Sequence, residues 1–235
     1  GLNVYGWMEY EPNDDGTYTF NTDGDVEALN IYSDDYNNNK RVIDACATSS
    51  ASLSGVLDSG EDAMTTSTSG NLDDIGTVPT EPQFSTTMTV YDELGNSYEV
   101  QINFTKCVVG TTSGTPAETA TSWYWEIEGS PDVTTAASGN VSGYIAFDSN
   151  GDLIADETGL EPSVDVVFSP TTAGTDSFTV SVDFSDITMT ADDSSVEADS
   201  VDGYESGTLE DYSIGSDGVI MGVYSNGQQQ PLGMI

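Results

Sequence analysis

The residues that could carry chemistry in this chain are almost all acidic. The 235-residue sequence contains 41 Asp and Glu, three Lys and Arg, and no His, which gives a formal net charge of −38. General acid–base catalysis would depend on carboxylates, Tyr or Lys, and the cations that bind phosphate or an oxyanion are scarce. A carboxylate pair for glycoside hydrolysis stays open, but so many acids produce many chance pairs. We predict no catalytic site and no cofactor.

One acidic segment has the ligand spacing of a calcium loop. The segment DSNGDLIADE places Asp148, Asn150 and Asp152 at the first three ligand positions of an EF-hand. The sixth position of such a loop should be Gly and is Leu153, and no helical pattern flanks the segment. The Asn-Gly pair between two apolar runs instead indicates a type I′ hairpin. We expect at most weak cation binding at these three residues.

Two cysteines and a row of aromatic residues are the remaining candidates. Cys46 and Cys107 have no second Cys near them, which excludes metal and redox motifs. We interpret them as small, half-buried strand residues, and a disulfide between them stays open. In SWYWEIE, Trp123 and Trp125 point to one face of a strand and Tyr124 to the other. Such a row builds a sandwich core more often than a carbohydrate-binding platform.

The elements that must position these residues are strands. β-Branched and aromatic residues alternate with polar ones, and Gly, Asn and Asp separate the runs at short intervals. Many short strands of this kind predict an all-β sandwich or barrel. The expected strands are residues 16–21, 26–32, 86–92, 97–105, 122–128, 143–148, 163–169, 176–185 and 218–225.

The composition changes at two places along the chain. Residues 47–74 are rich in Ser, Thr and Gly, and residues 191–203 are acidic and poor in apolar side chains. Both patterns are typical of loops or domain crossings. We therefore expect two β domains. Residues 1–54 with 198–235 form a discontinuous domain, and residues 55–197 form a barrel- or sandwich-like domain inserted into it.

The charge limits the partners. A chain with a net charge of −38 repels nucleic acid and anionic membranes. It attracts cations, or it suits a salty medium in which repulsion is screened. No run approaches the roughly 18 apolar residues of a membrane helix. The 12 Tyr, seven Phe and three Trp argue against a disordered acidic tail, because disordered segments are poor in aromatic residues.

Segments of the chain resemble, in order, those of bacterial flagellar hook proteins. TTMTVYDELGNSYEVQINFTK is similar to that family's tyrosine hairpin, WYWEIEG to its tryptophan strand, and GYIAFDSNGDL to its F-x-x-N-G-x-L hairpin. FTVSVDFSDIT resembles the strand before the return to the outer domain, and DGYESGTLEDYSIGSDGVIMGVYSNGQQQPLGMI resembles the closing segment. ATSSASLSGVLDS matches the entry to the inserted domain, with Val56 where the family has Asn. Hook proteins carry heptad helices at both termini, so we interpret this sequence as a central fragment.

The resemblance implies a structural subunit of the flagellar hook, the flexible tubular joint that transmits motor torque to the filament. It places the protein in the bacterial flagellum, extracellular or periplasmic after export. The implied partners are further copies in a helical homopolymer and other axial proteins, namely those of the rod, the hook–filament junction and the hook cap. The Ser/Thr/Gly-rich crossings would supply a hinge. Two alternatives are a distal-rod protein of the same system and a secreted acidic calcium- or carbohydrate-binding β module of an adhesin.

The resemblance also implies a candidate cross-link. Some spirochaete hook proteins join subunits covalently: a Cys loses its sulfur, and a Lys of the next subunit adds to the resulting dehydroalanine. In this sequence the candidates are Cys46 or Cys107 with Lys40 or Lys106. Two inert cysteines are the preferred interpretation, because the sequence shows no activation of either thiol.

Overall fold

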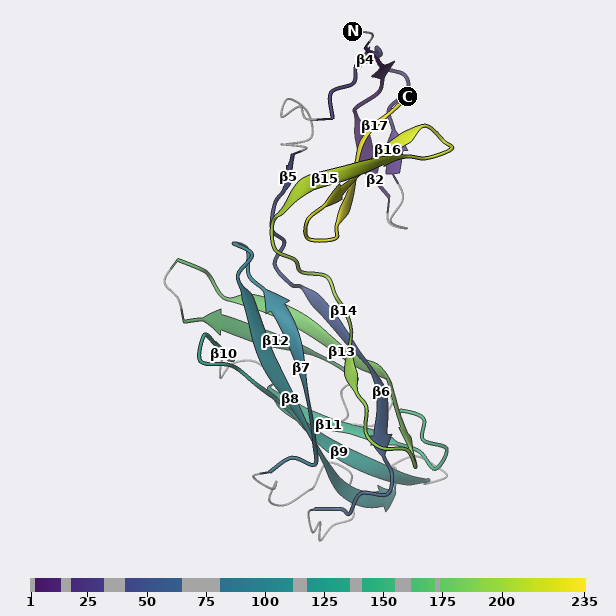
Figure 1. The fold of residues 1–235 in the computed structure, drawn as a ribbon. Coiled ribbons are helices and arrows are strands. Elements are labelled where there is room, and N and C mark those ends of the chain that lie inside the picture. Colours follow the sequence, from purple (N-terminus) through teal and green to yellow (C-terminus); the bar gives the residue numbers. More distant parts are fainter. Residues whose placement is uncertain are drawn as a thin grey trace. The chain divides into compact units, whose positions relative to one another are not determined.

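The computed structural model shows an all-β chain that divides into two compact units. It describes residues 3–13, 18–31, 41–64, 81–111, 118–135, 141–154, 162–171 and 174–235. Every regular element in these ranges is a strand, which confirms the predicted fold class (Figure 1). The first unit comprises residues 1–45 and 205–235, and the second comprises residues 46–204. The described part of the chain contains no helix that could span a membrane.

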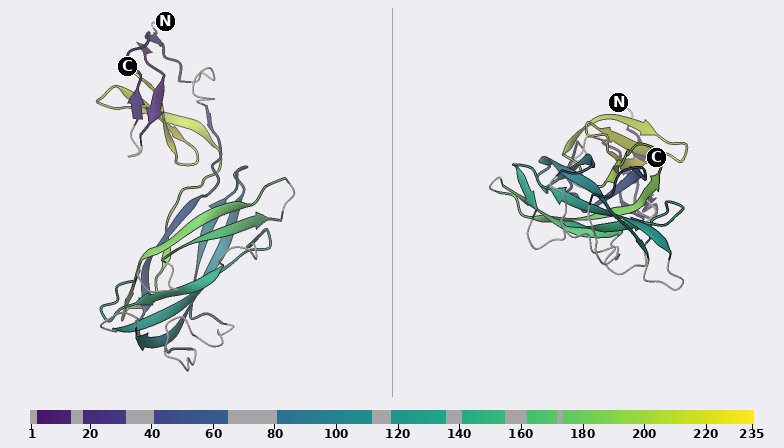
Figure 2. Two further views of the ribbon diagram at one scale, coloured as in Figure 1. Left: turned by 180° about the vertical axis from the view of Figure 1, so that it is seen from behind. Right: turned by 90° about the horizontal axis from the view of Figure 1, so that it is seen from below.

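The second unit is a sandwich of two sheets (Figures 1 and 2). One sheet consists, in spatial order, of β10 (Val133–Thr135), β12 (Ser163–Pro170), β13 (Phe178–Thr190), β6 (Ser50–Asp58) and β14 (Glu197–Val201). The other consists of β11 (Ser142–Phe147), β9 (Thr119–Glu128), β8 (Ser97–Thr111) and β7 (Phe84–Tyr91).

Alternating apolar residues fill the space between the two sheets. On β8, Val100, Ile102 and Phe104 are buried at every second position, as the two-residue period of a strand requires. The Trp125 ring of β9 stacks on the Phe184 ring of β13, with centroids 4.9 Å apart. Both sheets contribute to one continuous cluster of buried side chains, and this cluster is the core that holds the sandwich together.

The Ser-rich stretch near residue 50 forms a central strand, where we expected a loop and a hinge. β6 lies between β13, which is parallel to it, and β14, which is antiparallel. Its residues Leu53 and Leu57 are fully buried. Gly55 has φ +130° and a Cβ there would lie 2.6 Å from the Ser195 carbonyl oxygen, so this irregular position requires glycine. The expected hinge at residues 47–74 is therefore wrong for this part of the stretch.

The boundaries between the units also differ from the predicted ones. We placed them at 54/55 and 197/198, and the compact units meet at 45/46 and 204/205. The reason is that β6 and β14 pair with each other inside the sandwich, where Ser52 lies opposite Ser200. A boundary at residue 54 would cut β6 in the middle.

The first unit is built from short strands at both ends of the chain. Its four-stranded sheet consists of β17 (Gln229–Met234), β16 (Val219–Tyr224), β15 (Gly207–Ile214) and β5 (Val42–Ile43). Two two-stranded ribbons pair β1 (Tyr5–Gly6) with β4 (Glu27–Ala28) and β2 (Tyr10–Pro12) with β3 (Tyr18–Phe20). The backbones of Trp7, which follows β1, and of Met234 exchange two hydrogen bonds of 2.9 and 2.8 Å, and these bonds join the N-terminal segment to β17.

One type of hairpin loop recurs four times. Each loop has three residues and ends in a glycine with φ between +80° and +88°. The glycine N–H donates to the carbonyl oxygen of the residue before the loop, at 2.9–3.1 Å. The two-residue type I′ turn expected at Asn150-Gly151 is therefore a three-residue loop, a common alternative built around a left-handed glycine. The loops are residues 93–95, 149–151, 216–218 and 225–227.

Candidate functional site

The calcium-like spacing near residue 150 is used by one of these loops. The Asp148 carboxylate accepts hydrogen bonds from the backbone N–H of Asn150 (2.8 Å) and of Asp152 (3.0 Å), and from the Asn150 side-chain amide (2.9 Å). The backbone hydrogen bond from Asp152 is the main cause that holds the pKa of Asp148 below its usual value. The described residues contain no group of three His, Cys, Asp or Glu arranged to hold a metal ion. The geometry accounts for all three predicted ligands as parts of a turn.

Asp92 makes the same turn in a buried setting, and sequence reasoning missed it. Its carboxylate accepts the backbone N–H groups of Leu94 and Asn96, each at 2.9 Å, and the Asn96 side-chain amide at 2.9 Å. The Tyr98 hydroxyl donates a fourth bond of 2.8 Å. The Asp92 side chain is 1% exposed. The sequence signal that could have revealed it is an Asp at the start of a hairpin turn with a Tyr six residues later, here Asp92 and Tyr98.

The charge of Asp92 is stabilised by these bonds. Burial by itself would raise the pKa of Asp92, but hydrogen bonds from Asn96 and Tyr98 outweigh it, and the pKa lies below its usual value. Burial and the neighbouring Asp92 raise the pKa of the Tyr98 hydroxyl in turn. At neutral pH the pair is a charge-assisted hydrogen bond between a carboxylate and a neutral phenol.

The two cysteines lie in different environments and are not bonded to each other. The Cys107 side chain is fully buried, donates to the Thr105 carbonyl oxygen at 3.1 Å, and packs against Tyr124 and Tyr144. Cys46 is exposed, so neither cysteine has the half-buried position that we expected. It lies where the chain enters the second unit, and its backbone pairs with that of Tyr204.

The lysine candidates differ as well. Lys106 is 6% exposed, and its Nζ donates to the carbonyl oxygens of Ser59 (2.6 Å) and Glu61 (2.8 Å). Burial lowers the pKa of Lys106, while the carboxylates of Asp58 and Glu61 oppose that shift. Lys106 thus ties the segment after β6 to β8. Lys40 lies outside the described residues.

The tryptophan row belongs to the core. Trp123 and Trp125 are 0% and 1% exposed, so neither ring is available as a carbohydrate platform. Their indole N–H groups have no hydrogen-bond partner within the described part of the chain. Tyr124 points to the other face of the sheet, where its ring lies 5.5 Å from that of Tyr144.

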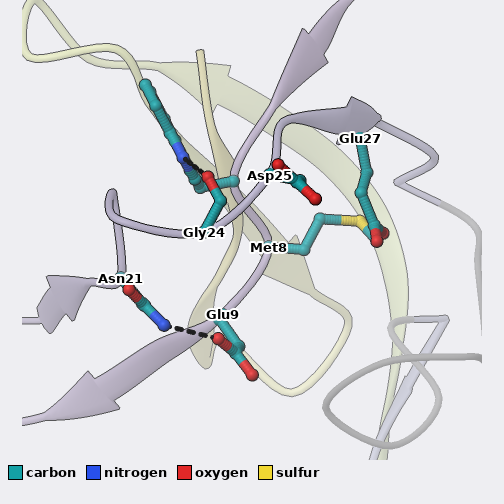
Figure 3. A pocket seen from close by; sticks show the side chains of 7 residues that line it. Met8, Glu9, Asn21, Gly24, Asp25 and Glu27 are labelled. Atoms are coloured by element: carbon teal, nitrogen blue, oxygen red, sulfur yellow. Dashed lines mark hydrogen bonds between the residues drawn. The ribbon is translucent and has the colours of Figure 1, made fainter.

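A pocket of about 290 Å³ lies in the first unit (Figure 3). The Trp7 indole donates to the Gly24 carbonyl oxygen at 3.1 Å, and the Asn21 amide donates to the Glu9 carboxylate at 2.7 Å. The lining side chains include no His, Lys, Ser or Cys, so no nucleophile is paired with a base there. The pocket is lined by Trp7, Met8, Glu9, Asn21, Gly24, Asp25 and Glu27.

The buried or hydrogen-bonded polar side chains therefore have structural roles: Asp92 and Asp148 stabilise turns, and Lys106 joins the segment after β6 to β8. Together with the filled core between the two sheets, they define a structural β module. The chain belongs to the flagellar hook protein family. The family model described as the flagellar basal body protein FlaE D2 domain matches residues 57–204, most of the second unit.

The relatives matched by sequence, both hook proteins, agree with this assignment. The chain is 33% identical over 175 residues to the flagellar hook protein FlgE of Treponema pallidum, covering 65% of this chain and 38% of that protein. It is 27% identical over 194 residues to FlgE of Salmonella typhimurium, covering 78% of this chain and 44% of that protein. A crystal structure of Helicobacter pylori FlgE2 matches with a TM-score of 0.44 and 23% identity, over 65% of this chain and 32% of that one. The chain thus spans less than half the length of these relatives.

Proposed function

We propose that this chain is the central part of a structural subunit of the bacterial flagellar hook, the flexible tube that transmits motor torque to the filament. The match of the hook-protein family model to residues 57–204 carries the proposal. Its proposed partners are further copies in a helical polymer and the adjoining axial proteins of the rod, the hook–filament junction and the hook cap. Subunits related by a rotation that does not close form such a helical filament.

The second unit has the properties that a torque-bearing subunit needs. Its core is continuous between two sheets, and close packing of this kind resists deformation. The two chain passages into the unit are tied together as well. Cys46 and Tyr204 exchange backbone hydrogen bonds of 2.9 and 3.0 Å. The Asp202 carboxylate accepts the Ser49 N–H (2.8 Å), the Ser49 hydroxyl (2.6 Å) and the Ser50 N–H (3.0 Å).

We propose no catalytic role for the chain. The sequence has no His, and the carboxylate of Asp92, the one acidic side chain that is fully buried among the described residues, already accepts four hydrogen bonds from its turn and from Tyr98. Hydrolysis of a glycan substrate by the purified chain, abolished by substitution of one carboxylate, would contradict this proposal. The two alternatives from the sequence, a distal-rod protein and an adhesin module, are not favoured by the relatives found, which are hook proteins.

Immunogold electron microscopy tests the proposed function. Antibodies raised against the purified chain are applied to the cells from which it derives and to their isolated flagella. We expect gold particles on the short curved segment between the cell envelope and the filament. Labelling of the rod would support the distal-rod protein instead, and labelling of the general cell surface would support the adhesin.

A covalent cross-link between subunits is a second proposal, and the exposure of Cys46 favours that residue. The Cys46 Sγ would leave with the α-hydrogen as hydrogen sulfide, and a lysine Nζ–H of the next subunit would add across the resulting double bond to form a C–N bond. The complete burial of Cys107 speaks against it as the source of the dehydroalanine, and the two carbonyl partners of Lys106 speak against it as the attacking amine. Mass spectrometry of isolated hooks should reveal a Cys46 peptide joined to a lysine peptide with the loss of one hydrogen sulfide. Recovery of only intact Cys46 would end the proposal.

A further inference from the structure

The four three-residue loops differ at their middle position, and one of them breaks the pattern. In three loops this residue is Asn150, Asp217 or Asn226, and its side chain makes a hydrogen bond within or next to the loop. Asn and Asp are favoured in turns for this reason. In the fourth loop, between β7 and β8, the middle residue is Leu94. An apolar side chain here gives up the hydrogen bond that the other three loops have.

The Leu94 side chain also projects into solvent. It is 66% exposed, the largest exposed fraction among the exposed large hydrophobic residues of the described chain. A single exposed leucine on a protein surface needs no special explanation. What distinguishes Leu94 is the combination of this exposure with a loop position at which polar residues stabilise the local structure.

The loop that carries Leu94 is anchored to the sandwich through buried groups. Its Asp92 is buried and accepts four hydrogen bonds, one of them from the Tyr98 hydroxyl of β8. The backbone of Tyr91, just before the loop, exchanges two bonds of 2.9 Å with Thr48. A side chain presented on such a rigid support loses little conformational entropy when it is buried by a partner, so its apolar surface contributes more fully to binding.

We propose that Leu94 is an apolar contact residue that packs against a second copy of this chain. The inference rests on the proposed function, because only a polymer brings copies together. Charge favours an apolar contact. With 41 acidic and three basic residues, two copies repel one another and have few ion pairs to form, so neutral and apolar groups must supply the attraction.

The size of the contact sets where it can be observed. A stable pair of proteins buries about 1,200–2,000 Å², far more than one leucine provides. The Leu94 contact therefore does not hold two free chains together. It acts in the assembled polymer, where other contacts bring the copies into register and where a small contact can form and break as the tube bends.

Site-specific photo-crosslinking tests the inference. A benzophenone amino acid replaces Leu94 in the hook protein of the source cells, and assembled hooks are irradiated. The matched control carries the same probe at Asn150, the middle residue of the loop of the same type at residues 149–151. We expect a product with the mass of two subunits from position 94 and none from position 150. Peptide mass spectrometry then identifies the residue captured.

Each result decides the inference. A product joining two copies supports it, whereas a product within one chain, a product with another flagellar protein, or no product from position 94 overturns it. The variant Leu94→Asn, which restores the pattern of the other loops, should leave the urea midpoint of the purified chain unchanged or higher and yet reduce swimming in viscous medium. Normal swimming of Leu94→Asn cells would count against the contact. If antibodies against the chain do not label hooks at all, the proposed function itself fails, and that outcome is distinct from labelled hooks without a crosslink.

Discussion

Replacing Asp92 by Asn tests whether a charged turn stabilises the second unit. The substitution keeps the shape of the side chain and removes its charge. The oxygen that accepts from Leu94 N–H and Asn96 N–H can stay in place. The new amide nitrogen replaces the oxygen that accepts from the Asn96 amide and the Tyr98 hydroxyl, and an amide nitrogen cannot accept these hydrogen bonds.

The magnitude follows from the four bonds. A hydrogen bond to a charged group contributes about 1.5–3 kcal/mol and a neutral one about 0.5–1.5 kcal/mol. The two bonds that become neutral each weaken by about 1–1.5 kcal/mol, and the other two can re-form as neutral bonds with the new amide as the donor, so we expect Asp92→Asn to lower the free energy of unfolding by about 2–4 kcal/mol. Asp92→Ala leaves the buried Tyr98 hydroxyl and three partly buried donors without an acceptor and should cost about 3–5 kcal/mol.

Urea unfolding followed by tryptophan fluorescence measures the effect, because Trp123 and Trp125 lie in the core of the second unit. The matched control is Asp148→Asn, which changes the same turn where it is exposed and lacks a tyrosine partner. We expect a clearly smaller loss for the control. Equal losses for the two variants would refute the role assigned to burial and to Tyr98.

The pH dependence gives an independent check. The pKa of Asp92 is lower in the folded chain than its usual value, so its contribution to stability is complete above a pH of about 4, the usual pKa of an Asp. The contribution is lost as the pH falls from there through the folded-state pKa. The difference between wild type and Asp92→Asn should shrink in this acidic range. A difference that stays constant from neutral to acidic pH would contradict the reasoning.

Four further predictions concern other parts of the chain. Gly151→Ala should lower the free energy of unfolding in urea by more than about 3 kcal/mol, because a Cβ there would overlap the Met189 carbonyl oxygen. Its control, Gly227→Ala, places a Cβ in open space and should lower that free energy only by the strain of a positive φ, about 1–2 kcal/mol. Burial raises the pKa of Tyr224 to about 12, so its contribution to stability is complete below pH 10 and is lost as the pH rises from about 10 towards 12. Tyr224→Phe should remove this contribution and leave the smaller alkaline dependence that Tyr98 and other buried tyrosines cause. Trp125→Phe should change the stability by no more than about 1 kcal/mol, because the cost of the smaller ring is offset by removal of a buried N–H without a described partner. Sedimentation at low salt should show a monomer, because chains with a net charge of −38 repel one another. Added NaCl screens this charge and should raise the urea midpoint more than sucrose does. A stable oligomer at micromolar concentration, or a midpoint that NaCl leaves unchanged, would refute this expectation.

Local patterns in the sequence determined the strands that pair with their neighbours along the chain. The alternation in SYEVQINFT defines which face of β8 is buried, because successive side chains of a strand point to opposite sides. The turn residues between β7 and β8 then place the two strands in one hairpin. The fold class and the family resemblance depend on patterns of this kind, and both could be established from the sequence.

The tertiary structure decided the pairings between distant segments. β6 was hidden because its serines and Gly55 are typical of loops, yet it lies beside β13, whose Ser181 pairs with Ser50. No local pattern specifies a partner 131 residues away. The tertiary structure also decided the burial of Asp92: its hydrogen-bond partners are local, but only the packing of the sandwich leaves its side chain 1% exposed. Periodicity determines which side chains a strand buries, whereas the partner of the strand is chosen by the free energy of the whole core, and that energy depends on contacts between residues far apart in the sequence.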